Sequence, residues 1–175
     1  MPAFSRSAGG SACAIVPEHE FKLGMRQVTS PVAVVTSRSG RVRNGLTATA
    51  ICSVSADPAT ILVCVNRNAS AEALIADSGS FAVNFLTEEQ HNIARLFSKS
   101  KLHPDERFAE GTWISMVTGA PVLEGAAASF DCKVAQCLEE GTHHICLGRV
   151  VGVASMDTDT LLYRDGLFRR LAQVE

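Results

Sequence analysis

Small polar side chains are concentrated in residues 44–55, and their types suit the binding of a flat ligand that carries a phosphate. They alternate with glycine and alanine, which let the backbone approach a flat ligand closely. Backbone N–H groups and hydroxyls can donate hydrogen bonds to a ring edge or to a phosphate. From the residues alone, a polar strand edge explains the segment at least as well as a ligand site does. The polar members are Asn44, Thr47, Thr49, Ser53 and Ser55.

A second polar cluster, at residues 66–70, follows a continuous apolar run at residues 60–66. The run predicts a strand that is buried on both faces. Asn68 or Ser70 could then cap a short helix, whose N-terminus favours an anion, and Arg67 could add a contact to a phosphate. An ordinary helix cap is the alternative interpretation.

Several common cofactor and nucleophile motifs are absent. The sequence contains no Gly-x-Gly-x-x-Gly, no phosphate loop ending in Gly-Lys-Ser/Thr, and no Gly-x-Ser-x-Gly. His143, His144 and Cys146 suggest a metal site, but adjacent strand residues point to opposite faces and zinc needs three or four convergent ligands. We therefore predict no metal site.

Strand patterns dominate the chain, and they lie close together with turns between them. We expect one further strand pair to meet at Asp165-Gly166, which is a strong hairpin signal. This order predicts a mainly β fold, an antiparallel Greek-key split β-barrel with a few flanking helices. The expected strands are residues 32–37, 41–46, 49–55, 60–66, 80–86, 129–138 and 143–154; the expected helices are 17–28, 68–76 and 87–97; residues 98–119 are expected to form a loop. Thr87 and Gln90 have the spacing of a capping box at the start of the last helix.

Composition narrows the class of protein. The chain has 175 residues, 46% of them hydrophobic, and a formal net charge of -2. This size suits one domain, which we place at residues 17–175 after a flexible N-terminal tail at 1–16. The charge argues against a nucleic-acid partner, and the apolar runs are too short for a membrane span. Reduced, buried thiols in a cytoplasmic protein best explain the cysteines Cys52, Cys64, Cys132, Cys137 and Cys146.

An ordered set of sequence segments resembles the flavin reductase family that serves two-component flavin monooxygenases. The resemblance covers nearly everything after residue 20 and implies a split β-barrel, a homodimer, FMN or FAD as hydride acceptor, and NADH or NADPH as donor. The matching segments are VTS at 35–37, GLTATAICSVSADP at 45–58, LVCVNRNAS at 62–70, FAVNFL at 81–86, ERF at 106–108, PVLEGAAASFDCKV at 121–134, GTH at 141–143 and the closing aromatic strand.

The resemblance also implies roles for particular residues. Thr47, Ala48 and Thr49 would contact the ribityl and phosphate region, and Cys52, Ser53 and Val54 would line the isoalloxazine edge. His143 would orient the nicotinamide, although Thr142 stands where many members carry an aspartate. Phe97 would shield the flavin. The remaining expected contacts are the phosphate residues Asn66, Arg67 and Ser70, together with Thr36, Asn44, Leu46, Tyr163 and Phe168.

The implied reaction is direct hydride transfer from nicotinamide to flavin, for which the protein supplies orientation rather than an acid–base pair. The reduced flavin would pass to a partner oxygenase. Two alternatives remain open at this point: a flavin-dependent cob(II)yrinic acid a,c-diamide reductase in cobalamin synthesis, and a non-catalytic module that binds flavin or haem.

Overall fold

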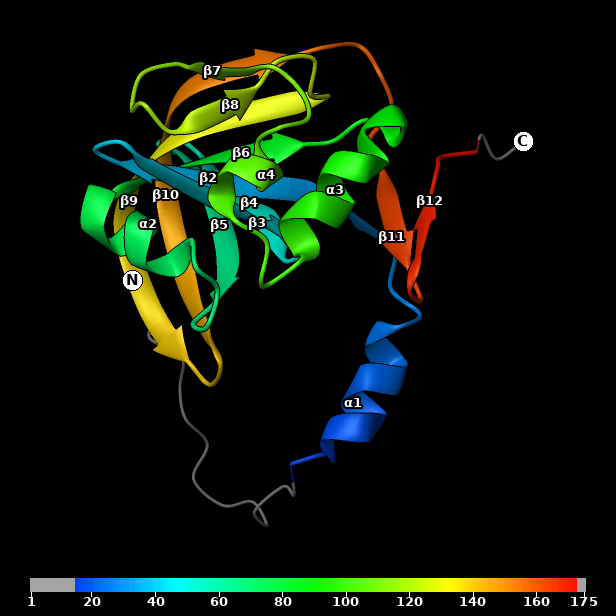
Figure 1. Ribbon diagram of the computed structural model, residues 1–175. Coiled ribbons are helices and arrows are strands. Elements are labelled where there is room, and N and C mark those ends of the chain that lie inside the picture. Colours follow the sequence, from blue (N-terminus) through cyan, green and yellow to red (C-terminus); the bar gives the residue numbers. More distant parts are fainter. Residues whose placement is uncertain (1–14, 173–175) are drawn as a thin grey trace.

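A curved antiparallel sheet forms the centre of the molecule in the computed structural model, which describes residues 15–172 (Figure 1). Its seven strands lie in the order β3-β2-β6-β9-β10-β5-β4. Their bounds are β2 Ala33–Ser39, β3 Val42–Ala48, β4 Ile51–Ala56, β5 Ala59–Asn66, β6 Ser80–Phe85, β9 Ala128–Glu140 and β10 His143–Ser155.

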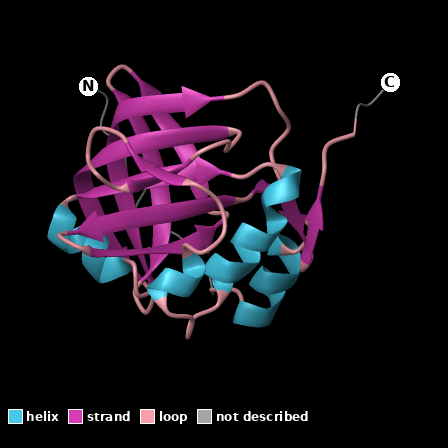
Figure 2. Cartoon of the chain, turned by 45° about the horizontal axis from the view of Figure 1, so that its top comes forward, coloured by secondary structure: helices cyan, strands magenta, loops and turns pink. Residues whose placement is uncertain are grey.

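The two edge strands, β3 and β4, are consecutive in the chain and only Thr49 and Ala50 separate them. The sheet therefore curls into a barrel that is open between these two strands, and the helices lie outside it (Figure 2). This confirms the predicted mainly β fold with a large antiparallel sheet. The expected tail at residues 1–16 falls almost wholly outside the described residues.

Smaller strands complete the fold. β1 (Ser30–Pro31), β11 (Leu162–Arg164) and β12 (Leu167–Arg169) form a three-stranded sheet, and β7 (Trp113–Ser115) pairs with β8 (Pro121–Leu123). The β11–β12 turn is at Asp165 and Gly166, whose φ angles of 49° and 78° are both positive. Such angles are typical of a tight hairpin turn, so the Asp-Gly signal predicted the hairpin correctly.

Two apolar clusters lie on opposite faces of β2, because side chains alternate along a strand. Val35 packs inside the barrel with Val63, Phe81 and other apolar side chains. Val34 packs outward in a cluster that includes the helix residues Ile93, Ala94 and Phe97. A strand buried on both faces explains the continuous apolar run in its sequence.

The helices are α1 (Glu18–Met25), α2 (Glu72–Ser78), the 3-10 turn η1 (Glu88–Gln90), α3 (His91–Ser98) and α4 (Pro104–Arg107). The predicted capping box between Thr87 and Gln90 is present, and it starts the helical segment that ends with α3. By contrast, α1 contains no buried residue. Among the described residues, no helix is both long and apolar enough to cross a membrane.

Three local expectations were wrong. Cys137 and Cys146 form a disulfide, because adjacent strands place them directly opposite each other, and Cys52 is exposed. The expected loop at 98–119 contains α4 and β7. Helix α2 begins only at Glu72, with Ala71 at its N-cap, and Ser70 Oγ accepts from Asn44 instead of capping the helix.

Candidate functional site

A polar cavity of about 360 Å³ lies where β3, the segment after β5 and the C-terminal end of α3 meet. It brings together five of the residues expected from the sequence: Leu46, Thr47, Asn66, Ser70 and Phe97. They come from three separate parts of the chain. The other lining residues are Gly45, Asn68, Ala69, Ser98, Lys99, Ser100 and Arg107.

Asn44 fixes the shape of one wall. Its side chain is only 6% exposed, and its Nδ2 donates to Ser70 Oγ at 2.9 Å. Its Oδ1 accepts from the backbone N–H of Gly45 at 2.8 Å. Asn44 therefore ties the segment after β5 to strand β3, so this predicted residue has a clear structural role behind the cavity.

Phe97 forms an apolar part of the opposite wall. It is 2% exposed and packs against Phe108 and Trp113, with ring centroids 5.0 and 5.4 Å away. A β-carbon added at Gly45 would lie 2.7 Å from Phe97 Cε1, so only glycine lets the ring lie this close to β3. The cavity thus has one rigid aromatic wall and one hydrogen-bonding wall.

Thr47 marks the passage from this cavity to its neighbours. Its Oγ1 donates to the carbonyl of Ala94 at 2.6 Å, which holds α3 against β3. Thr47 and Ser98 also line a second cavity of about 240 Å³ with Thr49, Tyr163 and Phe168.

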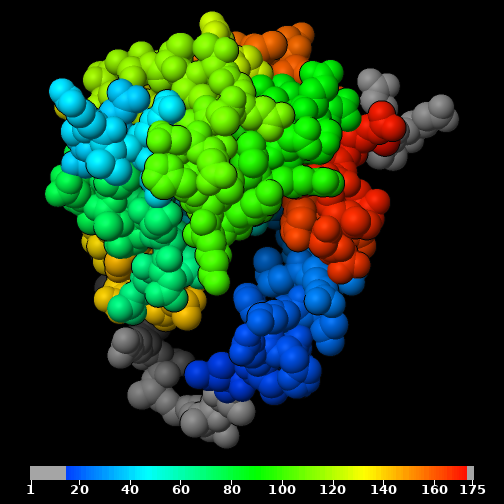
Figure 3. Space-filling model, viewed as in Figure 1, coloured from blue at the N-terminus to red at the C-terminus, as the bar shows by residue number. Residues whose placement is uncertain are grey.

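Thr49 and Tyr163 in turn line a third cavity, of about 510 Å³, which reaches Met25 and Val28 beside α1. Adjoining cavities share lining residues, and we call the three together the groove; it begins at β3 and ends beside α1. Figure 3 shows the open space between α1 and the body of the molecule.

The three cations near the polar end of the groove differ in what they bind. Arg67 does not line the cavity: its Nη1 pairs with Glu139 and lies 3.4 Å from the carbonyl of Gly141. Arg107 lines it but is 2% exposed and donates to the carbonyls of Phe97 and Leu102. Burial lowers the pKa of its guanidinium.

Lys99 is the remaining cation of this cavity lining. Within residues 15–172 its ammonium group makes no ion pair. Arg107 instead holds the loop that carries Lys99, since it also donates to the Lys99 carbonyl. The charge available to a phosphate in this cavity is therefore that of Lys99.

His143 opens strand β10 and is the cross-strand partner of Asn66, which lines the cavity. Its ring is half-buried, and its Nδ1 lies 2.9 Å from Thr142 Oγ1. The next residue, His144, faces the other way and pairs with Glu72 at 2.8 Å. His143 thus stands beside the groove, where an imidazole can orient a ligand.

The other expected residues lie away from the main cavity. Thr36 is fully buried and donates to the carbonyl of Pro121, and Ala48 belongs to the core. Cys52, Ser53 and Val54 are exposed on the edge strand β4 of the single chain.

Sequence reasoning did not single out Ser98, Lys99, Ser100 or Arg107 as site residues. A signal was present in the segment ERF at 106–108, which contains Arg107. Arg107 donates to the carbonyls of Lys99 and Ser100, which carry no local pattern of their own.

The groove can hold a flat ring along β3 with an anionic tail at Ser70 and Lys99. Hydroxyl and backbone donors line the polar wall, and Phe97 supplies the apolar one. Among the described residues no group of His, Cys, Asp and Glu could hold a metal ion. The apolar wall and the polar end with Ser70 and Lys99 fit the flat ring and the phosphate of a flavin mononucleotide.

Comparison of the sequence with known proteins also indicates a flavin-binding protein. The family model for the flavin reductase like domain matches residues 25–172. The FMN reductase (NADH) RutF of Stutzerimonas stutzeri is 38% identical over 149 residues, 85% of each chain. The FMN reductase (NADH) RutF 1 of Methylorubrum extorquens is 40% identical over 162 residues, 92% of this chain and 80% of the relative.

Solved structures agree. An NADH:FAD oxidoreductase of Streptomyces globisporus has a TM-score of 0.81 and 30% identity, over 94% of this chain and all of the other. BorF, the flavin reductase component of a bacterial two-component tryptophan halogenase, has a TM-score of 0.82 and 32% identity, over 90% of this chain and 100% of BorF.

Proposed function

The chain belongs to the flavin reductase-like family, and from this premise we propose that it is an NADH-dependent reductase that transfers hydride to FMN. The observation that carries the proposal is the groove along β3, whose polar end and aromatic wall suit a flat ring with a phosphate. The names of its relatives, FMN reductases that use NADH, support the choice of donor and acceptor.

The chemistry when flavin is bound is hydride acceptance by its ring. The residues of this chain bind the flavin and orient the nicotinamide against it. Lys99 and Ser70 hold the phosphate, Asn66 donates to the polar parts, and Phe97 excludes water from one face of the groove. The hydroxyl of Thr47 donates to the Ala94 carbonyl, so toward the ligand it acts as an acceptor. His143 positions the nicotinamide, so that the reacting groups meet in a productive geometry. No side chain has to take a proton.

The test is an anaerobic titration of the purified protein with NADH in the presence of FMN, followed by visible absorbance. We expect FMN to bind and its absorbance to bleach in step with NADH oxidation, with NADPH and FAD as poorer substitutes. Failure to bind flavin, or binding without any NADH or NADPH oxidation, would refute the proposal and favour a non-catalytic module. A cob(II)yrinic acid a,c-diamide acceptor can be added in a separate arm.

We also propose that the reduced flavin is passed to a separate oxygenase component. The support is that BorF serves a two-component halogenase, and another similar structure is a nitrilotriacetate monooxygenase component B. The groove is open to solvent along β3, which suits release of a product flavin. We place this work in the cytoplasm, where NADH is available, and assign it to one domain at 17–175.

Finally, we propose a homodimer. The support is the set of large apolar side chains exposed on the single chain, above all on α1, which has no buried residue and stands away from the barrel (Figure 1). Phe21, Leu23 and Met25 are 59%, 58% and 49% exposed. Exposed apolar residues gathered on one helix are typical of a surface that a partner covers. The second chain would also shelter Cys52, Ser53 and Val54 on β4.

A further inference from the structure

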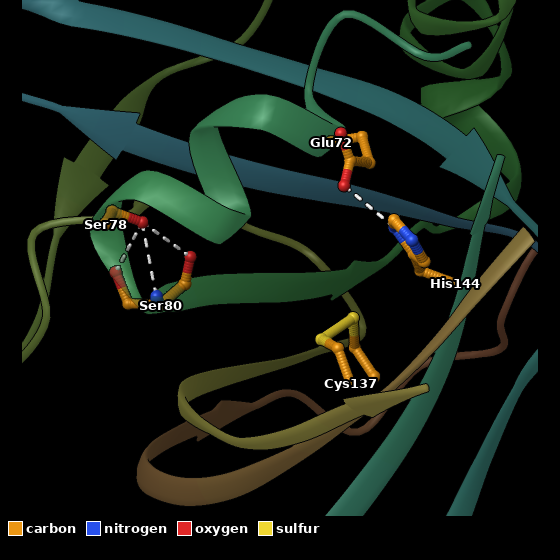
Figure 4. The surroundings of a disulfide bond; sticks show 6 residues. Glu72, Ser78, Ser80, Cys137 and His144 are labelled. Atoms are coloured by element: carbon orange, nitrogen blue, oxygen red, sulfur yellow. Dashed lines mark hydrogen bonds and ion pairs between the residues drawn. A yellow bond between two sulfur atoms is a disulfide. The ribbon is translucent and has the colours of Figure 1, made fainter. Parts of the chain in front are cut away.

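The Cys137–Cys146 disulfide joins the two strands of the hairpin that lies beside the groove (Figure 4). The two residues are direct cross-strand partners on β9 and β10, nine positions apart in sequence. The hairpin turns at Gly141 and Thr142. The bond thus fastens the hairpin a few residues below its tip.

The β9 side of this hairpin has few other attachments. β9 pairs with β6 up to Lys133, and the next residue, Val134, donates to the carbonyl of Gly79 at 2.9 Å. Beyond that, β10 is the only strand that pairs with β9 within residues 15–172. The β9–β10 register also shifts between Leu147 and Gly148, directly below the disulfide. β10 is held on its other side by β5. The disulfide therefore links the end of β9, which pairs on one side only, to β10, which pairs on both sides.

The end of the β9–β10 hairpin that the disulfide holds contacts the segment that lines the cavity. Glu139 pairs with Arg67, and the carbonyl of Thr142 accepts from the backbone N–H of Arg67 at 3.0 Å. On the other arm, His144 pairs with Glu72 at the start of α2. Between these two attachments lie Asn68, Ala69 and Ser70, which line the cavity. A looser hairpin would leave these three residues less well placed.

The disulfide can be reached from solvent. Cys137 is exposed, whereas Cys146 is 3% exposed. Both also border a small cavity of about 260 Å³ between α2 and the hairpin, which Glu72 and His144 line as well. A thiol can therefore approach Cys137 Sγ, which leaves Cys146 as the sulfur displaced.

We propose that Cys137 and Cys146 form a redox-active dithiol–disulfide site that sets the affinity of the neighbouring groove for flavin. A thiolate of an external dithiol attacks Cys137 Sγ, and Cys146 leaves as a thiolate. The second thiol of the reductant then displaces Cys137 from the mixed disulfide. The reductant ends as a disulfide, and the two protons that it loses convert Cys137 and Cys146 to thiols. The oxidised form binds FMN tightly and the reduced form binds it weakly. This proposal rests on the proposed function in its choice of flavin as ligand.

The experiment compares the same protein with its disulfide intact and after reduction by dithiothreitol in the native state. Peptide mapping after alkylation reports whether 137 and 146 are linked, hydrogen exchange reports the amides of 66–70 and 138–144, and flavin fluorescence gives the Kd for FMN. We expect reduction to speed exchange in both segments and to raise the Kd about fivefold or more. The double variant Cys137→Ser/Cys146→Ser should match the reduced protein and ignore the reductant. Cys64→Ser, which keeps the disulfide, should respond as the wild type does.

The outcomes separate the two proposals. A pair that stays linked in native protein under excess dithiothreitol, or that is reduced without change in either hydrogen exchange or Kd, overturns the inference. Absence of flavin binding in the oxidised protein overturns the proposed function instead. Faster exchange at 66–70 on reduction, measured without flavin, would still support a redox-controlled groove in that case.

Discussion

At the scale of single residues, the cation that lines the cavity differs from the one that the sequence suggested. Arg67 stands in the segment that the sequence marks for phosphate, but cross-strand geometry gives its guanidinium to Glu139. Lys99 reaches the cavity only because Arg107, eight residues later, holds the loop. A loop position that is set by a distant side chain leaves no local pattern. The sequence could therefore predict the polar cluster at 66–70 but not that Lys99 lines the same cavity.

We expect Lys99→Ala to raise the Kd for FMN about tenfold, which is about 1.4 kcal/mol and within the range of a lost charge-assisted hydrogen bond. Riboflavin lacks the phosphate, so its Kd should change little. Arg67→Ala is the matched variant and should affect both ligands alike, through the position of the loop. Fluorescence titration with each flavin gives the Kd of the variant relative to that of the wild type. A phosphate-specific loss in Arg67→Ala with none in Lys99→Ala would reverse the assignment.

His143 gives a second prediction at this scale. If its imidazole orients the nicotinamide, His143→Ala should lower kcat/KM for NADH about tenfold and leave the Kd for FMN nearly unchanged. His143→Gln, which can still hydrogen-bond, should recover part of the loss. Steady-state kinetics with NADH as the varied substrate provide the measurement. An equal loss of FMN affinity would mean that His143 only supports the loop across from Asn66.

Cys132 gives a prediction about pH. Burial, with a smaller contribution from Asp131, raises the pKa of its thiol from 9.0 to about 12. Between pH 9 and 12 the unfolded thiol ionises while the folded one stays protonated, so this contribution to stability is complete below pH 9 and is lost as pH rises through the window. We expect the unfolding free energy of the wild type to fall more steeply over that range than that of Cys132→Ala. Parallel pH profiles of denaturant unfolding would contradict the raised pKa.

At the scale of elements, the sequence predicted several strands, a helix start and a turn correctly, but it did not predict the register of the β9–β10 hairpin. The capping box at Thr87, the Asp165-Gly166 turn and the apolar runs in β2 and β5 all depend on neighbours in sequence, and each predicted its element correctly. The pairing of Cys137 with Cys146 was missed although the two residues are only nine positions apart. Their pairing depends on where the β9–β10 turn falls, and hydrophobic periodicity alone did not fix that register.

The contact between β3 and α3 leads to a prediction about an element. At Gly45 a β-carbon would meet Phe97 at 2.7 Å and the carbonyl of Val35 at 2.8 Å. Gly45→Ala should therefore cost about 1–3 kcal/mol and displace the aromatic wall of the groove. Gly24→Ala is the control, since a β-carbon there meets nothing within 4 Å and alanine favours the exposed helix α1. Thermal unfolding of both variants gives the comparison, and equal midpoints would show that Phe97 moves aside without cost.

At the scale of the whole molecule, the single chain leaves its groove open toward α1, and this is the feature that a second copy would change. Met25 and Val28 line the far end of the groove while remaining 49% exposed each. Helix α1 has no buried residue, although its C-cap residue Arg26 lies 3.9 Å from Asp165. A helix with an apolar stripe and no buried side chain contributes little to folding, so its stripe is better explained by association.

We expect the wild type to elute and sediment as a dimer, and Phe21→Ser/Met25→Ser to shift toward the monomer. Because neither side chain is buried within one chain, the barrel of the variant should keep its near-UV circular dichroism and its sheet content. FMN affinity should fall with dimer content, since Met25 lines the groove directly. Lys22→Ser, on the same helix but charged, is the matched control and should remain dimeric. A wild-type monomer at micromolar concentration, or a variant that stays fully dimeric, would contradict the assignment of this helix to the interface.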